Sequence, residues 1–455
     1  MIVMKFGGTS VANADRLKNV ADIVIQEKEK HGSPVVVLSA MSGVTNMLIE
    51  GGQKAKERSL DEALAIVKEI RQKHIDAINE LFESEETKGA LLDHMNKSLS
   101  ELEVLYKGVS YLGELTRRSL DMISGTGELL SSKILSAYLN ANKVKAKWLD
   151  ARTFIKTDGS FGNAHPLWEM TKSKTLGAIM TEIAAGNVVV TQGFIGSTSE
   201  GITTTLGRGG SDYSASIIGV SCEAEEIQIW TDVDGMLSAD PRVVEDARII
   251  PSVSFKEASE LAYFGAKVLH PLTIKPAVER SIPVKILNSM NPEAKGTLIT
   301  AESRNDEPIC AIASKKKITA LFINSLDMLM AHGYLARIFA VFDRFKTPID
   351  LITTSEVSVS ITIDNTENLE AIVEALSELA SVSVMQNVAI VSVVGKHFRD
   401  QSGIAGSVFD ALSDINILMI SGGASDINLS MVVSSEDADK AVRNLHAKYF
   451  SKVAK

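Results

Sequence analysis

Apolar residues in the first two thirds of the chain follow two alternating patterns. Short apolar runs, such as Ile2–Phe6, Pro34–Leu38 and Val188–Phe194, have the length and composition of buried strands. Between them lie longer segments in which apolar residues recur every three or four positions, the period of an amphipathic helix. This alternation continues to about Ala301 and predicts an α/β domain with a mainly parallel sheet sandwiched by helices. One charged helical stretch, from about residue 47 to 119, predicts a solvated excursion without chemistry of its own.

The last third of the chain has a different organisation. A polar run that ends at Pro308 predicts a linker over 302–315. Beyond it the order strand, helix, strand, strand, helix occurs twice, which is typical of a ferredoxin-like tandem repeat. The first copy is predicted as strand 318–325, helix 334–346, strands 349–354 and 357–363, and helix 367–379. The second is predicted as strand 388–394, helix 403–413, strands 415–420 and 427–433, and helix 436–448.

Composition narrows the range of partners and compartments. The 455 residues carry a formal net charge of −10, which argues against nucleic acid and against an anionic membrane as partners. The sequence has no run of about 18 apolar residues, and Met1 leads directly into the first strand, so we expect neither a membrane span nor a signal peptide. The two cysteines, Cys222 and Cys310, form no disulfide framework and no zinc site, which favours a reducing cytoplasm.

The most informative segment is Thr203–Asp212, which contains hydroxyls, glycines, an arginine and an acid. Glycines let a backbone approach a ligand and present N–H groups to an anion, and the apolar run that follows predicts a helix whose N-terminus favours phosphate or carboxylate. Arg208 can bind a planar carboxylate through two parallel hydrogen bonds. The segment matches neither of the common nucleotide fingerprints, GxxxxGK[ST] and GxGxxG. It therefore predicts an anion-binding loop, with a simple glycine-rich turn as the alternative.

Two further junctions between a strand and a loop carry similar chemistry. The first strand contains Lys5 and is followed by Gly7 and Gly8, so that a phosphate could lie over the glycines beside the lysine amine. The strand Val35–Leu38 runs into the hydroxyl-rich segment Ser39–Asn46. Open α/β sheets bind their ligands at the carboxyl ends of strands. The three junctions together predict one composite anion site.

Several segments of the chain resemble motifs of the aspartate kinases (aspartokinases), a family of the amino-acid kinase superfamily. They occur in order along nearly the whole chain, and DLITTSEVSVS resembles the family's regulatory region. The other segments are MKFGGTSVA, VVLSAMSGVTN, TTTLGRGGSDYSA, WTDVDGMLSADPR and FGAKVLHP. The resemblance implies an amino-acid kinase catalytic domain over 1–301 and ACT domains over 316–387 and 388–448. In this family the second ACT unit is inserted into the first, whose last strand comes from the chain end, for which 449–455 is the candidate here.

The resemblance also implies an ATP site, with Mg²⁺ carried by the nucleotide and no metal site made by protein alone. Lys5 and Lys267 would neutralise the phosphates, and Asp212 would hold these lysines or contact the magnesium complex, so these three are the implied catalytic residues. Leu237 stands where many relatives carry tyrosine, so it offers the base only a hydrophobic contact. The implied ATP-binding residues are Lys5, Gly7, Gly8, Ser10, Thr231, Asp232, Leu237, Arg242 and Lys267.

Aspartate recognition requires a group for the α-carboxylate and an acid for the ammonium. The resemblance assigns the carboxylate to Arg208 and the ammonium to Glu128, for which a helix N-terminal acid is the alternative role. The family usually reads Ser-x-Gly-Glu at this loop, whereas Gly125 replaces the serine here, which changes the hydrogen bonding of the loop. The other implied aspartate-binding residues are Ser39, Thr45 and Ser211.

The segment Asp350–Glu356 resembles the inhibitor-binding segment of lysine-sensitive aspartokinases. A carboxylate from Asp350 or Glu356 could pair with the ε-ammonium of a bound lysine, and capping of neighbouring elements is the alternative role. Ala331 stands where a relative offers a serine, which leaves threonine open as the effector. The implied effector-binding residues are Met328, Ala331, Tyr334, Leu335, Ile349, Asp350, Thr354, Ser355 and Glu356.

The implied activity is ATP-dependent phosphorylation of L-aspartate to 4-phospho-L-aspartate, the first step of lysine, threonine and methionine biosynthesis, in a homodimer or dimer of dimers formed through the ACT domains. Two alternatives stay open: a kinase of glutamate, acetylglutamate or a nucleotide, and a catalytically silent amino-acid sensor. Arg208 and Glu128 together favour a free amino acid, and the presence of Lys5, Asp212 and Lys267 argues against the sensor. Since the chain ends at residue 455 with no downstream dinucleotide fingerprint, we expect no fused homoserine dehydrogenase.

Overall fold

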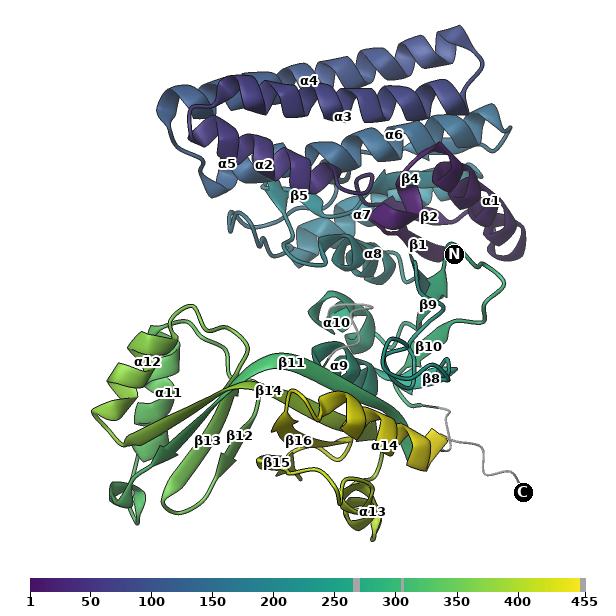
Figure 1. Ribbon diagram of the computed structural model, residues 1–455. Helices are drawn as coiled ribbons and strands as arrows, with labels where there is room; N and C mark the ends of the chain where they lie inside the picture. The colour runs from purple at the N-terminus through teal and green to yellow at the C-terminus, as the bar shows by residue number, and fades with distance from the viewer. Residues whose placement is uncertain (265–270, 304–306, 451–455) are drawn as a thin grey trace. The chain divides into compact units, whose positions relative to one another are not determined.

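The computed structural model of the protein describes residues 1–264, 271–303 and 307–450 (Figure 1). The described residues form two compact units. The first unit contains residues 1–236 and 271–303, and the second contains residues 237–264 and 307–450.

A mainly parallel sheet forms the centre of the first unit. The strands are bonded in the order β3-β4-β2-β1-β7-β9-β10, and only β10 is antiparallel to its neighbour β9. Ile2, Met4 and Phe6 of β1 are fully buried, as expected for a parallel strand covered on both faces. The strands are β1 (Ile2–Phe6), β2 (Val35–Leu38), β3 (Ala146–Trp148), β4 (Val188–Gln192), β7 (Glu226–Thr231), β9 (Val284–Asn288) and β10 (Thr297–Thr300).

Helices cover both faces of this sheet. Helix α1 (Ala14–His31) and helix α6 (Thr126–Ala141) lie on one face, where Leu17 and Val20 share a core with Met4 and Phe6. Helices α7 (Trp168–Ala184) and α8 (Gly210–Ser221) lie on the other face. This arrangement confirms the predicted α/β architecture. Further elements of the unit are the 3-10 helices η1 (Gly8–Val11) and η2 (Ala151–Thr153), the hairpin β5 (Ile195–Ser197) and β6 (Thr203–Thr205), and α10 (Pro271–Glu279).

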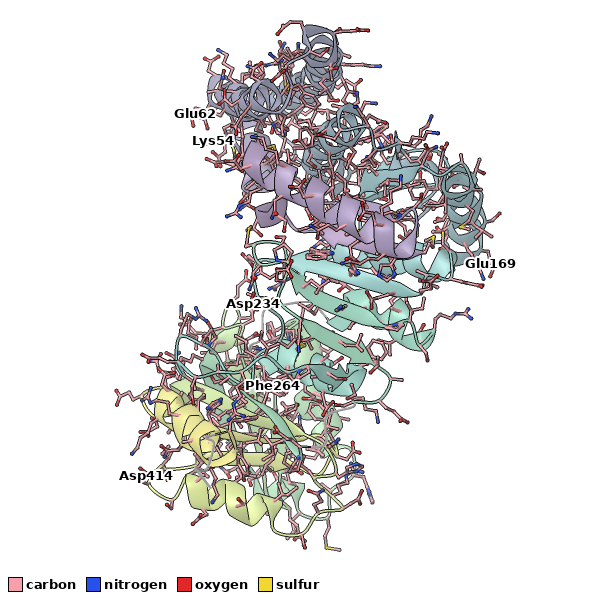
Figure 2. All side chains as sticks on the ribbon, turned by 90° about the vertical axis from the view of Figure 1, so that its right-hand side faces the viewer. Lys54, Glu62, Glu169, Asp234, Phe264 and Asp414 are labelled. Atoms are coloured by element: carbon pink, nitrogen blue, oxygen red, sulfur yellow. The ribbon has the colours of Figure 1, made fainter. Side chains whose placement is uncertain are left out.

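The charged stretch between residues 47 and 119 forms a helical layer with a core of its own (Figure 1). Tyr106 is fully buried there and donates its hydroxyl to the carbonyl of Leu48 at 2.8 Å. At the solvent edge Lys54 and Glu62, both labelled in Figure 2, form an ion pair of 2.7 Å. The layer is therefore packed on its inner side and solvated only on its outer side. Its helices are α2 (Val44–Lys56), α3 (Leu60–Leu81), α4 (Glu85–Leu112) and α5 (Arg117–Ser124).

The second unit contains the predicted tandem repeat as one antiparallel sheet in the order β12-β13-β11-β14-β16-β15. Every predicted strand and helix of the two repeats is present, and most ends differ by a few residues. The exceptions are β11 and β14, which begin nine and seven residues before the predicted strands. The first repeat has β11 (Ile309–Asn324), η3 (Leu326–Met328), α11 (Tyr334–Arg344), β12 (Ile352–Thr354), β13 (Ser358–Ile363) and α12 (Leu369–Ser377). The second has β14 (Ser381–Gly395), α13 (Ile404–Ala411), β15 (Met419–Gly422), β16 (Asn428–Ser434) and α14 (Ala438–Phe450).

The predicted linker and the predicted order of insertion are wrong. Residues 309–315 belong to β11 and pair with 390–395 of β14, so they complete the sheet of the second repeat. The strand that completes the first repeat is 381–385, at the start of β14. Of the predicted strand 449–455, Tyr449 and Phe450 end helix α14, and 451–455 lie outside the described residues. The second repeat is thus the interrupted one. Its first strand was missed because the apolar run Ile309–Ala313 is short and is followed by three lysines, of which Lys317 has a φ of 61°.

Residues 237–264 belong to the second unit, whereas the sequence predicted that the first domain continues to residue 301. Ala239 and Val244 share a core with Ile309 and Ile312 of β11, and Ser238 Oγ lies 2.9 Å from His446 Nε2 of α14. The segment also contains β8 (Ser252–Ser254) and α9 (Phe255–Phe264). Its part around Ser238, Ala239 and Val244 therefore packs within the second unit. In neither unit does a helix of the described residues have the length and apolar character needed to cross a membrane.

Candidate active site

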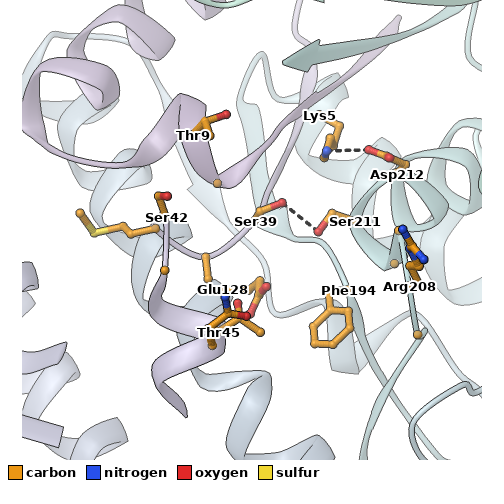
Figure 3. A pocket seen from close by; sticks show the side chains of 18 of the residues that line it. Lys5, Thr9, Ser39, Ser42, Thr45, Glu128, Phe194, Arg208, Ser211 and Asp212 are labelled. Atoms are coloured by element: carbon orange, nitrogen blue, oxygen red, sulfur yellow. Dashed lines mark hydrogen bonds and ion pairs between the residues drawn. The ribbon is translucent and has the colours of Figure 1, made fainter. Parts of the chain in front are cut away.

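A cavity of about 560 Å³ opens at the carboxyl ends of the parallel strands in the first unit (Figure 3). This is the edge at which open α/β sheets bind ligands. All five residues predicted to bind aspartate line the cavity, and so do four of those predicted to bind ATP or to act in catalysis. The predicted residues in the lining are Lys5, Gly8, Ser39, Thr45, Glu128, Arg208, Ser211, Asp212 and Asp232.

Lys5 and Asp212 form a nearly buried ion pair at one side of the cavity. Lys5 Nζ lies 2.6 Å from Asp212 Oδ1, and the two side chains are 12% and 11% exposed. Lys5 is held by the centre of the sheet, because β1 is paired on both sides, whereas Asp212 belongs to the first turn of α8. The pair therefore places an ammonium group on a rigid strand at the cavity wall, as a phosphate-binding lysine requires.

The N-termini of α2 and α8 also meet this cavity, since Gly43 and Thr45 of the first and Gly210 and Ser211 of the second line it. Helix N-termini present unsatisfied N–H groups and a partial positive charge. The hydroxyl of Ser39, at the end of β2, donates to Ser211 Oγ at 2.9 Å and links the two sides. The cavity is thus suited to anionic ligands although the whole chain is acidic.

Glu128 is the most unusual acid of the cavity. It lies in the first turn of α6, only 3% of the residue is exposed, and its Oε2 has no hydrogen-bond partner within the described residues. Burial raises the pKa of Glu128 to about 8, although hydrogen bonds from its own N–H and from the N–H of Ala40 act to lower the pKa. A buried carboxylate oxygen without a partner is costly, so this position is prepared for a cationic group of a ligand.

Arg208 contrasts with Glu128 in exposure. It is an exposed residue between Gly207 and Gly209, and its guanidinium has no hydrogen bond or ion pair with any part of the chain that the structure describes. Figure 3 shows it on the α8 side of the cavity, near Ser211 and Asp212. The guanidinium is therefore available for a carboxylate or phosphate of a ligand.

The structure gives a steric reason for glycine at position 125. A Cβ atom built on it would lie 2.7 Å from Ile195 Cγ2 and 3.3 Å from the carbonyl of Asp121. The serine that the family usually carries would not fit unless Ile195 moved. The replacement thus matches the close approach of β5 to the start of α6.

Three other predicted ATP-binding residues are not among the described residues that line the cavity. The N–H of Gly7 donates to the carbonyl of Trp230 at 3.2 Å, so it is used between strands rather than offered to a phosphate. Ser10 is buried and its Oγ lies 2.7 Å from Ser289 Oγ. Thr231 donates its hydroxyl to Asp232 at 3.2 Å.

The remaining predicted residues of this set lie elsewhere in the chain. Leu237 and Arg242 belong to the second unit, where Arg242 is bound to Asp240 at 2.6 Å. Lys267 lies outside the described residues. Its predicted role stays a prediction.

Sequence reasoning missed one residue of the cavity with an unusual backbone. Phe194 lines the cavity, has a φ of 69° and receives the N–H of Leu206 on its carbonyl at 2.9 Å. A phenylalanine in the left-handed region is strained and such residues concentrate at functional sites. Only its position directly after a buried strand pointed to it. The other lining residues that were not assigned are Thr9, Ala40, Met41, Ser42, Gly43, Asn46, Gly207, Gly209 and Gly210.

A second cavity, of about 460 Å³, lies in the first repeat of the second unit. It contains six of the residues predicted to bind the effector: Met328, Ala331, Tyr334, Leu335, Ser355 and Glu356. Leu329, Met330 and Gly333 complete the lining. Tyr334 is held by a hydrogen bond from its hydroxyl to the carbonyl of Leu379 at 2.6 Å. The described lining is mainly apolar, with Glu356 as its acid.

Asp350 does not belong to this lining. Its Oδ1 lies 2.7 Å from Lys315 Nζ and accepts the hydroxyl of Tyr263 at 2.9 Å. The pKa of Asp350 is raised by burial, although the hydrogen bond from Lys315 opposes this shift. Ile349 packs on the hydrophobic core of the repeat, and Thr354 is exposed on β12. These three residues are therefore outside the described lining, and their contacts with an effector stay predictions.

Comparison with known proteins finds a kinase family in the first part of the chain and an ACT domain near its end. Residues 1–288 match the profile "Amino acid kinase family", and residues 391–449 match "ACT domain". Aspartokinase 1, chloroplastic, of Arabidopsis thaliana is 40% identical over 98% of this chain and 80% of its own length. Lysine-sensitive aspartokinase 3 of Escherichia coli is 36% identical over 99% of both chains.

Solved structures show the same similarity. The chain resembles E. coli aspartokinase III in complex with aspartate and ADP, in the R-state, with a TM-score of 0.84 and 35% identity over 99% of this chain and 100% of that one. It resembles the complex of the same enzyme with lysine and aspartate, in the T-state, with a TM-score of 0.83 and 36% identity. Full-length similarity at this level of identity, with both a kinase and an ACT match, shows that the chain belongs to the aspartokinases of the amino acid kinase family.

Proposed function

We propose that the protein transfers the γ-phosphoryl group of ATP to the side-chain carboxylate of L-aspartate. The observation that carries this proposal is the cavity of the first unit, which combines a buried acid, Glu128, with a guanidinium, Arg208, and a rigid ammonium, Lys5. Among the described residues, Glu128 Oε2 and the Arg208 guanidinium have no hydrogen-bond partner. Free amino acids have an ammonium and a carboxylate on one carbon. The first two groups match these charges, and the third is left for phosphate.

The bound aspartate would be oriented by its α-carbon groups. Arg208 would bind the α-carboxylate through two hydrogen bonds, and Glu128 would bind the α-ammonium in its ionised form. Ser39, Thr45 and Ser211 line the same cavity and offer hydroxyl groups to the substrate. The side-chain carboxylate is then free to face the nucleotide.

The chemistry requires no general base. A side-chain carboxylate is already ionised near neutral pH. One of its oxygens forms a bond to the γ-phosphorus while the bond from that phosphorus to the β,γ-bridging oxygen breaks, and ADP leaves with the electron pair. Catalysis is then positioning and stabilisation of charge on the phosphoryl oxygens. Lys5, held by Asp212, would supply that charge.

ATP-using kinases work with a divalent metal, and Mg²⁺ is the proposed ion. Oxygen ligands suit Mg²⁺, and Asp232, directly after β7, lines the cavity. Among the described residues, its carboxylate accepts a hydrogen bond only from Thr231. Bound Mg²⁺ would neutralise the charge of the phosphates. We propose that it enters with ATP and that Asp232 contacts it.

The direct test is an assay of ADP release by the purified protein with ATP, Mg²⁺ and either L-aspartate, L-glutamate or N-acetylglutamate. We expect release that depends on aspartate and is far weaker with the other two. Preference for glutamate or N-acetylglutamate would place the protein with another substrate of the superfamily. No turnover with any acceptor, together with binding of an amino acid, would support the silent sensor.

We further propose that lysine inhibits the enzyme from the cavity of the second unit. Glu356 would pair with the ε-ammonium, while Met328, Tyr334 and Leu335 would contact the aliphatic chain. A relative at 36% identity is named lysine-sensitive, which supports lysine over threonine. Titration of lysine, threonine and methionine against activity tests the assignment, and no response to lysine at millimolar concentration would contradict it.

We also propose a homodimer that pairs through the first repeat, in the cytoplasm. Large apolar side chains are exposed around the cavity and on α11, with Leu326 82% and Met330 93% exposed, together with Leu335 and Phe339. An exposed apolar surface of this kind favours association. Both cysteines are free and buried, which suits a reducing compartment. Sedimentation equilibrium with and without lysine tests the assembly.

A further inference from the structure

One buried carboxylate outside the cavity joins the segments that carry Arg208 and Glu128. Asp121 belongs to α5, and only 2% of the residue is exposed. Its Oδ2 accepts the N–H groups of Gly162 and Thr205, both at 2.9 Å, and its Oδ1 accepts the hydroxyl of Thr205 at 2.7 Å. Asp121 is not among the described residues that line the cavity. It binds Gly162 and Thr205 instead, which lie next to the lining segment of Arg208.

The three donors belong to two segments that hold the backbone before Arg208 in place. Thr205 ends β6 three positions before Arg208, and its carbonyl accepts the N–H of Ala164 at 2.9 Å. The loop of Gly162 is packed against the residue next to Arg208, since a Cβ atom on Gly207 would lie 2.5 Å from Asn163 Oδ1. Asp121 thus holds the segments of Gly162 and Thr205, and the contact between these segments positions the backbone of Arg208.

The backbone of Asp121 is bonded to the start of α6, the helix that carries Glu128. Its carbonyl accepts the N–H of Gly125 at 3.1 Å, and Gly125 is the residue that joins α5 to α6. Glu128 follows in the first turn of α6. One residue therefore contacts the segments of both Arg208 and Glu128, although these two are far apart in sequence.

We propose that Asp121 is a positioning residue for aspartate, which sets the guanidinium of Arg208 relative to the carboxylate of Glu128 so that one amino acid binds both. The inference rests on the proposed function of these two residues. An amino acid spans a fixed distance between its ammonium and carboxylate, so small displacements of one group reduce the fit. Nucleotide contacts, which are assigned to Lys5 and Asp232, do not pass through Asp121.

The first experiment compares steady-state kinetics of the full-length protein and Asp121→Asn, with aspartate and ATP varied separately. Asparagine has the same shape, but its amide group cannot accept from all three donors. We expect kcat/KM for aspartate to fall roughly 10- to 100-fold, with the KM for ATP changed by less than about twofold. Thermal unfolding of each protein is measured in parallel.

A matched set of threonine variants keeps the test valid if Asp121→Asn does not fold. Thr205→Val removes the hydroxyl that Asp121 Oδ1 accepts, and Thr205→Ser retains a hydroxyl. Thr204→Val is the control, because Thr204 is equally buried on the same strand but its Oγ1 lies 2.7 Å from Thr157 Oγ1. We expect weaker aspartate use in Thr205→Val, recovery in Thr205→Ser, and a KM for aspartate close to that of the parent in Thr204→Val.

The outcomes distinguish failure of the proposed function from failure of the role inferred for Asp121. If the parent protein shows no turnover with aspartate, the proposed function fails. If the parent turns over aspartate, but Asp121→Asn and Thr205→Val lower only the melting temperature, Asp121 is merely structural and the inference is overturned. Equal losses for aspartate and ATP, or an equal effect of Thr204→Val, would overturn it as well.

Discussion

Lys5 Nζ and Asp212 Oδ1 lie 2.6 Å apart, where the central strand of the sheet meets the first turn of α8. In Lys5→Ala the phosphoryl oxygens would lose an ammonium group, and Asp212 would be left unpaired. We expect turnover to fall roughly 100-fold or more with the fold retained. The measurement is ADP release, with circular dichroism to check folding. Lys18→Ala, on the exposed face of α1, is the control and should keep normal turnover.

Arg208→Lys keeps the positive charge but loses the planar pair of donors. Since aspartate would be bound by both donors, we expect its KM to rise steeply, with a much smaller change in the affinity for ATP. Initial rates with each substrate varied in turn give both values. Loss of ATP affinity with an unchanged dependence on aspartate would assign Arg208 to the nucleotide.

Glu128 gives the protein a pH dependence of substrate binding. Its pKa in the folded protein without ligand is raised to about 8 by burial, so the carboxyl is mainly protonated at neutral pH. Only the ionised form can pair with an ammonium. We therefore expect kcat/KM for aspartate to increase with pH up to about 8 and then to level off. In Glu128→Gln the value should be low and should lose this dependence, whereas Glu62→Gln, at an exposed site, should keep it.

The same shift affects stability with the opposite sign. An acid whose folded pKa lies above its ordinary value of 4.5 stabilises the fold fully below 4.5, and this contribution is lost as the pH rises through about 8. Glu128→Gln removes the titration, so its melting temperature relative to the parent should improve between about pH 5 and pH 9. Thermal unfolding without ligands at both pH values tests this. A constant difference would mean that Glu128 is ionised in the free protein.

Glu356 tests the effector cavity. Glu356→Ala removes the acid of the described lining, and a hydrogen bond between charged groups contributes about 1.5–3 kcal/mol, so half-inhibition should require about 10-fold more lysine or above. Turnover without lysine should stay near that of the parent. Asp350→Asn provides the contrast, since its partners are Lys315 and Tyr263, and it should lower the melting temperature. If Asp350→Asn weakened lysine binding and Glu356→Ala did not, the assignment of the two acids would be reversed.

Local pattern was sufficient to predict much of the fold. Apolar runs such as β1 and β2 are buried on both faces, and glycines and hydroxyls directly after them identified the cavity edge. The tandem repeat was predicted because its helices and strands differ clearly in apolar period. Membership of residues 237–264 in the second unit could not be predicted, since it depends on contacts such as Ser238 with His446, which are far apart in sequence.

The site was predictable in its residue types but not in its environments. Nothing in the sequence indicates that Glu128 Oε2 lacks a partner among the described residues, that the N–H of Gly7 donates to Trp230, or that Asp350 pairs with Lys315. These properties arise from how separate segments pack. Phe194 is a related case, because its positive φ is set by the turn between β4 and β5 and not by its own preference.

The most direct test of the account is to trap the product. A phosphorylated carboxylate is an acyl phosphate, which hydroxylamine converts to a hydroxamate. We therefore expect the purified protein with ATP, Mg²⁺, L-aspartate and hydroxylamine to form aspartyl hydroxamate in proportion to the ADP released, and Lys5→Ala to form almost none. Release of ADP without hydroxamate, or hydroxamate formed from glutamate in preference to aspartate, would contradict the proposed function.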